Sequence, residues 1–137
     1  MNSKSIPNAL RKFVFERAAG RYEYCLIHQK ASMYSHEIDH IIPQKHGGRT
    51  EANNLALSCL SCNRYKGSDF ATIDPKTEDI IPLFNPRKQI WSEKFSLNEA
   101  RIEGRTQIGI ATVRLLRLNA LKRLIEREVL LKQKRYP

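Results

Sequence analysis

The sequence predicts a small α+β protein with helices near both ends and short strands between them. Three observations support this fold class. The chain has 137 residues, a length that fits one domain with one small hydrophobic core. Apolar residues recur at helical spacing near both ends of the chain. Between these ends the apolar runs are short and are interrupted by proline and glycine, which is typical of strands and loops.

The first half of the chain is predicted to begin with a helix. Pro7 suits a first helical turn and Gly20 suits a helix end. In order, the expected elements are a helix over 7–19, a turn entering a strand over 21–30, a strand over 36–42, a loop over 43–52, and a helical turn, a knuckle and the start of another helix over 53–66.

The second half is predicted to be irregular at first and helical at its end. In order, the expected elements are a short strand near 80–84, a hairpin or docking segment over 91–104, a helix over 108–118, a turn or N-cap at Asn119, and a basic amphipathic helix over 120–135. The apolar side of this last helix is expected to hold four residues: Leu121, Leu124, Ile125 and Leu131.

The charge of the chain indicates a polyanionic partner. The sequence has 24 Lys and Arg against 14 Asp and Glu, a formal charge of +10, which attracts nucleic acid or an anionic membrane. No apolar run approaches the roughly 18 residues that span a bilayer. Residues 1–20 carry charges instead of the apolar core of a signal peptide, so a cytoplasmic protein is expected. Three cysteines, an odd number, do not predict a disulfide framework.

A charged pair stands inside an apolar run at residues 36–48, HEIDHIIPQKHGG. The imidazole of His40 is a suitable base near neutral pH because its unperturbed pKa is about 6.5. Asp39, directly before it, is the acid of the pair. Further polar residues follow at fixed spacing: Asn54, Cys59, Cys62, Asn63 and Lys66.

This pattern closely resembles that of the HNH endonuclease family, in its bacterial type with CxxC motifs. The resemblance implies a ββα-metal (His-Me finger) core, in which a two-stranded hairpin and a helix fold around one divalent metal. It also implies that the substrate is DNA and the reaction is phosphodiester hydrolysis. The motif core is expected over 21–67 and a C-terminal extension over 68–137, together one HNH nuclease domain over 1–137.

The resemblance implies a role for each matching residue. His40 is expected to be the general base that activates water. Asp39 and Asn63 are expected to hold Mg²⁺ or Mn²⁺, and Asn54 is expected to orient the site through hydrogen bonds. Three basic residues beside the site are expected to contact phosphates of DNA: Arg49, Arg64 and Lys66. The alternative is a zinc-knuckle module that binds nucleic acid without catalysis.

The cysteines depart from the family pattern at one position. Members of this type usually carry two CxxC knuckles that hold a structural zinc ion with four thiolates, but Tyr22 stands where the first cysteine is expected. Cys25, Cys59 and Cys62 leave one position of a four-coordinate site open. His28 would complete a Cys₃His zinc site. Alternatively, the zinc has been lost and Tyr22 packs in its place. The sequence leaves both alternatives open.

The basic C-terminal helix also has two interpretations. Its arginines and lysines, between Arg114 and Arg135, would extend a track of phosphate contacts. Alternatively, they form a solvated helix face whose charge is diluted by Glu126 and Glu128.

Overall fold

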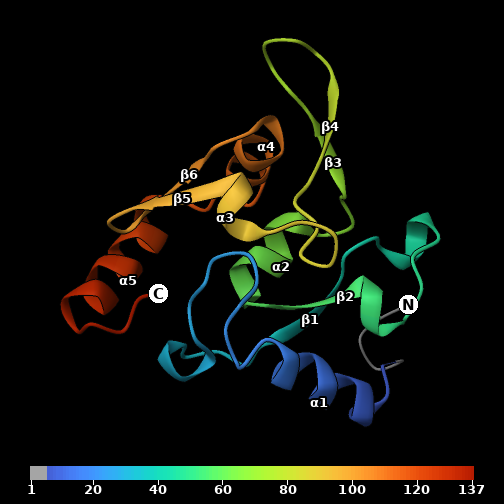
Figure 1. Ribbon diagram of the computed structural model, residues 1–137, viewed down its shortest axis with the longest axis horizontal. Coiled ribbons are helices and arrows are strands. Elements are labelled where there is room, and N and C mark those ends of the chain that lie inside the picture. The colour runs from blue at the N-terminus through green and yellow to red at the C-terminus, as the bar shows by residue number, and fades with distance from the viewer. Residues whose placement is uncertain (1–5) are drawn as a thin grey trace.

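The fold is α+β, as predicted. The computed structural model describes residues 6–137, and its short helices and strand pairs are shown in Figure 1. In chain order the elements are α1 (Asn8–Arg17), β1 (Glu37–His40), β2 (Leu55–Ser58), α2 (Leu60–Lys66), β3 (Ala71–Ile73), β4 (Ile80–Pro82), α3 (Trp91–Lys94), β5 (Phe95–Asn98), β6 (Arg101–Gly104), α4 (Gln107–Leu115) and α5 (Leu121–Lys132).

A ββα unit forms the part of the fold that the HNH resemblance implied. Strands β1 and β2 pair antiparallel, from Glu37 opposite Ser58 to His40 opposite Leu55, and α2 follows β2 almost at once. The separate prediction of a helical turn at this point missed β2. All four of its residues are buried, so the run has no alternating pattern from which a strand could be recognised. The strand expected within 21–30 is also absent there, where turns and a single bridge between Arg21 and His28 are found.

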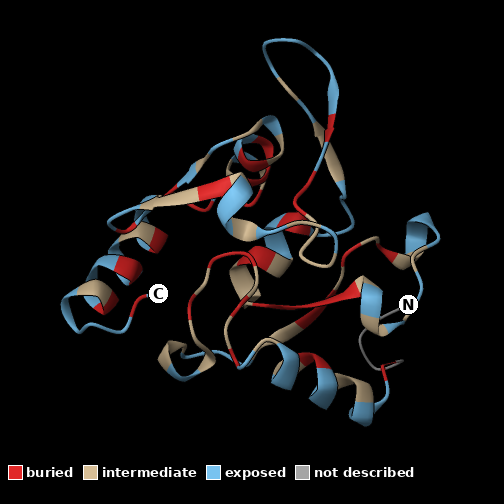
Figure 2. Cartoon of the chain, viewed as in Figure 1, coloured by how far each residue is buried: buried red, intermediate tan, exposed pale blue. Residues whose placement is uncertain are grey.

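Two further hairpins follow the ββα unit. Strands β3 and β4 pair antiparallel, and their hairpin extends away from the rest of the chain at the top of Figure 1. Figure 2 shows that the outer part of this hairpin is exposed. Strands β5 and β6 form the hairpin that was predicted within 91–104, and helix α4 packs against β6.

One hydrophobic core joins the two halves of the chain. Buried residues of the ββα unit and the segment before it pack with buried residues from the C-terminal half, including Tyr24, Leu57, Phe84, Leu116, Leu118 and Leu130. Hydrogen bonds add to this contact. Trp91 Nε1 donates to the carbonyl of Tyr24 at 3.0 Å, and the hydroxyl of Tyr136 donates to the carbonyl of Cys25 at 2.8 Å. The C-terminal half therefore supports the segment that carries the candidate site.

The predicted apolar side of the last helix is wrong in part. Leu121 and Ile125 are 74% and 50% exposed, whereas Arg123 and Arg127 are 6% and 0% exposed. The buried guanidinium groups find backbone acceptors, as when Arg127 donates to the carbonyl of Leu118 at 2.6 Å. Such acceptors and the long apolar stem of arginine allow these side chains to lie in the interior, although Arg127 Nη1 has no hydrogen-bond partner among the described residues. Both interpretations of this helix, a track of phosphate contacts and a solvated face, place its basic residues at the surface. For Arg123 and Arg127 that placement is wrong.

Asn119 lies in the turn between α4 and α5, which confirms the first of its two predicted roles, a turn or an N-cap. Its side chain accepts from the backbone N–H of Ile102 at 2.9 Å and donates to the carbonyl of Ile102 at 2.7 Å. The N-cap of α5 is Ala120, which offers no side-chain cap. Asn119 therefore joins strand β6 to the turn between α4 and α5.

Candidate active site

An open pocket of about 580 Å³ lies between β1, the loop after it and α2. Its lining comes from two segments of the chain: Glu37, Ile38, Asp39, His40, Pro43, Gln44, Lys45, Asn63, Gly67 and Ser68. The structure thus brings together Asp39, His40 and Asn63, the proposed base and metal ligands, from a strand and a helix that are separated in sequence.

Strand β1 ends at the acid and the imidazole. Neighbouring side chains on a regular strand point to opposite faces, so Asp39 and His40 require a bulge or a strand end to line one pocket. The pairing of β1 with β2 is regular and His40 is the last residue of the strand. The strand end therefore accounts for the position of both side chains along the pocket.

The imidazole of His40 is half-buried and held by a hydroxyl group. Its Nε2 lies 2.9 Å from Thr50 Oγ1, and Gln44 Nε2 donates to the same oxygen at 3.2 Å. Burial lowers the pKa of His40 below its ordinary value, although the nearby charge of Asp39 acts in the opposite direction. The neutral imidazole, which is the form that accepts a proton, is therefore favoured near pH 7. The sequence analysis missed Thr50 because a threonine in a polar loop carries no signal of its own.

The carboxylate of Asp39 is buried, with 3% of the residue exposed. The hydroxyl of Tyr24 donates to Oδ2 at 2.7 Å, and Lys66 Nζ donates to Oδ1 at 3.1 Å. Burial raises the pKa of Asp39, while Lys66 and Tyr24 oppose that rise. Because a carboxylate oxygen accepts more than one hydrogen bond or ligand contact, both oxygens retain an acceptor position.

Lys66 is not placed for the phosphate contact that the sequence suggested. The residue is 1% exposed. Its ammonium group donates to Asp39 and also to the carbonyls of His40 and Ile41, at 3.1 and 3.0 Å. These three acceptors satisfy its three donors, so Lys66 binds the end of β1 from within the protein. Arg49 and Arg64 are exposed, as a contact with phosphates requires, and Arg49 lies 3.7 Å from Glu51 in an ion pair.

The side chain of Asn54 holds the loop beyond β1. Its Oδ1 accepts from the N–H of Ile42 at 2.9 Å, and its Nδ2 donates to the carbonyls of Ile42 and Arg49 at 3.0 and 2.9 Å. Gly48 lies against this contact, where an added Cβ would meet the carbonyl oxygen of Ile42 at 1.6 Å. These bonds are of the kind that the predicted orienting role of Asn54 requires.

The pocket offers the donor types of a hard divalent cation. Carboxylates of Glu37 and Asp39 and the amide of Asn63 line it, and Mg²⁺ and Mn²⁺ prefer such oxygen ligands. The residues present therefore fit a divalent metal in this pocket.

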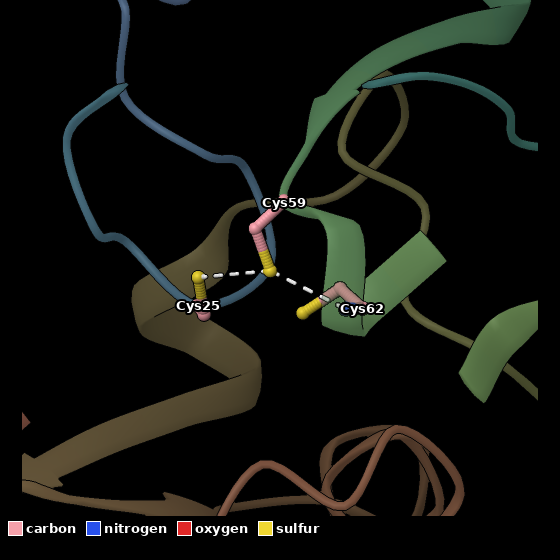
Figure 3. A group of neighbouring side chains, drawn as sticks. All are labelled: Cys25, Cys59 and Cys62. Atoms are coloured by element: carbon pink, nitrogen blue, oxygen red, sulfur yellow. Dashed lines mark hydrogen bonds between the residues drawn. The ribbon is translucent and has the colours of Figure 1, made fainter. Parts of the chain in front are cut away.

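A second group of side chains lies at the other end of α2, where three cysteines meet (Figure 3). Cys25 comes from a loop, Cys59 is the N-cap of α2 and Cys62 lies in its first turn. Their sulfur atoms lie within 4.8 Å of one another, and the sulfurs of Cys25 and Cys59 are 3.9 Å apart. Within residues 6–137, these three residues form a group whose ligand atoms lie close enough together that they could hold a metal ion.

His28 does not join these cysteines. Its Nε2 lies 3.0 Å from the carbonyl oxygen of Ala19, and its Nδ1 accepts from the N–H of Lys30 at 3.1 Å. Both ring nitrogens are thus engaged with the backbone, and the Cys₃His arrangement suggested by the sequence is not formed. Tyr22, in contrast, is buried, and its hydroxyl donates to Gln29 Oε1 at 3.0 Å. This position agrees with the alternative in which Tyr22 packs.

The cysteine cluster instead contacts Arg123 of helix α5. Arg123 Nη2 lies 3.0 Å from the sulfur of Cys62 and 3.5 Å from that of Cys59, and Nη1 donates to the carbonyl of Leu116 at 2.8 Å. Hydrogen bonds from Cys25 and Cys62 lower the pKa of Cys59 to about 2, and Arg123 contributes to this decrease. Burial raises the pKa of Cys62 to about 12. The cluster therefore favours a single thiolate beside the guanidinium group.

These sites can now be compared with known protein families. Residues 23–69 match the family model of the HNH endonuclease. The match includes the ββα unit, the pocket and all three cysteines, and it confirms the predicted resemblance. HNH endonucleases act on nucleic acids and use a divalent metal. Arg123 and the rest of the C-terminal half lie outside the match.

One further comparison and one property of the helices complete this description. No curated protein matches the chain at a significant level. Within residues 6–137, none of the helices has both the length and the apolar character that crossing a membrane requires.

Proposed function

We propose that this protein is a metal-dependent endonuclease that hydrolyses DNA phosphodiester bonds, with residues 1–137 acting as one domain. One observation carries the proposal: an imidazole, a buried carboxylate and an amide line the same pocket within the segment that matches the HNH family. A module that only binds nucleic acid has no use for a neutral imidazole beside oxygen ligands.

His40 takes a proton from the water that attacks the phosphorus. Its lowered pKa keeps the ring neutral near pH 7, and Thr50 fixes the orientation of the ring. General base catalysis of this kind contributes on the order of 10²–10⁴-fold to a rate. Asn54 supports His40 indirectly. It donates a hydrogen bond to the carbonyl of Arg49, the residue before Thr50, and Thr50 contacts the His40 ring.

Asp39 and Asn63 would hold Mg²⁺ or Mn²⁺. When bound, the cation supplies charge stabilisation at the phosphoryl and leaving oxygens. Lys66 and Tyr24 orient the Asp39 carboxylate toward this task, because both donate hydrogen bonds to it and both favour its ionised form.

DNA binds through positive charge on the surface around the pocket. Arg49 and Arg64 are exposed and contact phosphates on either side of the scissile bond. Such contacts position the duplex without reading its sequence. The chain has an odd number of cysteines, which does not suit a disulfide framework, and the compartment we propose is the cytoplasm.

The test is cleavage of supercoiled plasmid by the purified protein, with Mg²⁺, with Mn²⁺ and with EDTA. We expect nicked or linear products with either metal and none with EDTA. His40→Ala should reduce the rate by about 10²–10⁴-fold without changing the midpoint of a DNA gel shift. His46→Ala is the matched control, because His46 is exposed and does not line the pocket.

Two results would contradict the proposal. Cleavage by His40→Ala at the wild-type rate would remove His40 from the role of base. DNA binding without any cleavage in either metal would favour the alternative of a nucleic-acid-binding module without catalysis.

A further inference from the structure

The cysteine cluster is completed by a side chain from outside the HNH segment. Arg123 lies 61 residues beyond Cys62 in sequence, yet it is 6% exposed and its Nη2 is 3.0 Å from the Cys62 sulfur. A strongly hydrated charge does not enter a protein interior without a partner of opposite charge or a set of acceptors. Arg123 has both, since Nη1 donates to Leu116 and Nη2 contacts two sulfurs.

The donor set does not fit a closed structural zinc site. Such sites are almost always four-coordinate, and the cluster supplies three sulfurs. His28 is engaged elsewhere, and the hydroxyl of Tyr22 donates to Gln29. The guanidinium group of Arg123 carries only N–H donors and no lone pair for a metal, so it cannot serve as the fourth ligand.

The guanidinium group of Arg123 can supply the positive charge that a metal ion would otherwise supply beside the cysteine sulfurs. In a zinc site the cation offsets the negative charge of thiolates that are removed from water. Here the positive charge beside the sulfurs belongs to Arg123. Its Nη2 contacts the sulfurs of Cys62 and Cys59 at 3.0 and 3.5 Å, and a cysteine sulfur can accept hydrogen bonds from such a donor.

We propose that Arg123 takes the place of a metal ion, so that hydrogen bonds from its guanidinium group to the sulfurs of Cys59 and Cys62, and not structural zinc, fasten helix α5 to the HNH segment. The proposal concerns the fold and does not depend on nuclease activity. It does affect the pocket, because Cys62 and Asn63 are neighbours in α2. The contact with Arg123 fixes the first turn of the helix that presents Asn63.

The first experiment measures metal in the full-length protein, expressed in zinc-supplemented medium and purified without chelator. We expect zinc far below one ion per chain by elemental analysis after exhaustive dialysis. Zinc retained at one ion per chain would overturn the proposal.

The second experiment tests the contact itself with a double-mutant cycle of Arg123→Met and Cys62→Ala, followed by thermal unfolding. Each single variant should lower the melting temperature, and the double variant should lower it by less than the sum, because both remove the same interaction. Lys122→Met, an exposed change on the same helix, is the control and should leave the melting temperature unchanged. An Arg123→Met protein as stable as wild type, or strictly additive effects, would contradict the proposal.

If Arg123→Met does not fold, elemental analysis of the wild-type protein still decides whether the cysteine cluster holds zinc.

Discussion

Two buried cations lie near helix α2, one toward each of its ends. Lys66, at the end of the helix, is 1% exposed and pairs with Asp39 beside the pocket. Arg123, from helix α5, is 6% exposed and contacts Cys59 and Cys62 at the start of α2. The lysine and its partner both lie inside the HNH segment, whereas the arginine reaches its partners from outside it.

This comparison changes how much of the formal charge of +10 can be assigned to DNA binding. The sequence analysis predicted a phosphate contact for Lys66 and left open whether the basic residues of the last helix contact DNA or form a solvated face. The structure places Lys66, Arg123 and Arg127 in the interior, where each donates to at least one backbone carbonyl. Part of the formal +10 is therefore structural, and the charge available to a polyanion is smaller than the sequence indicates.

The largest expected effect is on stability, from Lys66→Met. The change leaves the Asp39 carboxylate buried without its cation, and breaking a buried pair in this way costs about 3–5 kcal/mol. Urea unfolding at pH 7 should show a decrease of this size in the free energy of unfolding. Lys45→Met is the matched control, because Lys45 also lines the pocket but is exposed.

The pH dependence of this loss has a definite sign. Burial already raises the pKa of Asp39 and Lys66 opposes that rise, so without Lys66 the folded-state pKa moves further above the unfolded value of about 3.9. The destabilisation should therefore be smallest near the unfolded pKa and increase as the pH rises above it. A loss of stability that is equal at acidic and neutral pH would show that Lys66 acts by packing and not by charge.

Asn54→Ala tests a neutral contact in the same segment. The variant loses hydrogen bonds to Ile42 and Arg49 and leaves backbone groups near Gly48 without partners. A fully buried polar group left unsatisfied costs about 1–3 kcal/mol, and because these groups are only partly buried or exposed, the loss should be smaller than that of Lys66→Met. Because no charge is involved, urea unfolding should give the same loss at every pH tested. A loss that varies with pH, or one that exceeds the effect of Lys66→Met, would contradict this ranking.

The two sites also differ in how far the sequence could predict them. The HNH residues follow one another at fixed spacing, so the pattern predicted the ββα unit and the residues that line the pocket. Thr50 and Tyr24 were missed because their hydrogen bonds to His40 and Asp39 depend on how the loops fold back.

The C-terminal half gave weaker signals. Its apolar spacing predicted the helices, but the spacing could not show that α5 buries Arg123 and Arg127 while Leu121 is exposed. Which face of a helix is buried depends on the acceptors that the rest of the chain presents. Here those acceptors are carbonyls at the end of α4 and cysteines far away in sequence.

A smaller effect, on rate, is expected from Thr50→Val. The wild-type rate should rise with pH as His40 loses its proton, and because burial lowers the pKa of His40, the midpoint of the acid limb should lie below the ordinary value of about 6.5. The variant keeps the shape of Thr50 but loses the hydroxyl that holds the ring, and one such hydrogen bond corresponds to about a tenfold lower rate. Pre-steady-state cleavage rates measured from about pH 5 to about pH 8 check both expectations, because this range brackets the titration of a histidine. An acid limb centred above the ordinary histidine value would exclude His40 as the titrating base.

The smallest expected effect is on DNA affinity, and it separates exposed from buried cations. Removing one phosphate contact lowers the slope of log affinity against log salt by about 1. Arg64→Ala should show a decrease of this order in gel shifts at several salt concentrations. Arg49→Ala should show less, because Arg49 already pairs with Glu51 at 3.7 Å and part of its charge is offset before DNA binds. Arg123→Met, which removes a buried cation, should leave the slope unchanged in the folded variant. If Arg123→Met lowered the slope as much as Arg64→Ala does, Arg123 would have to contact DNA, and the distinction between the buried and exposed charges would fail.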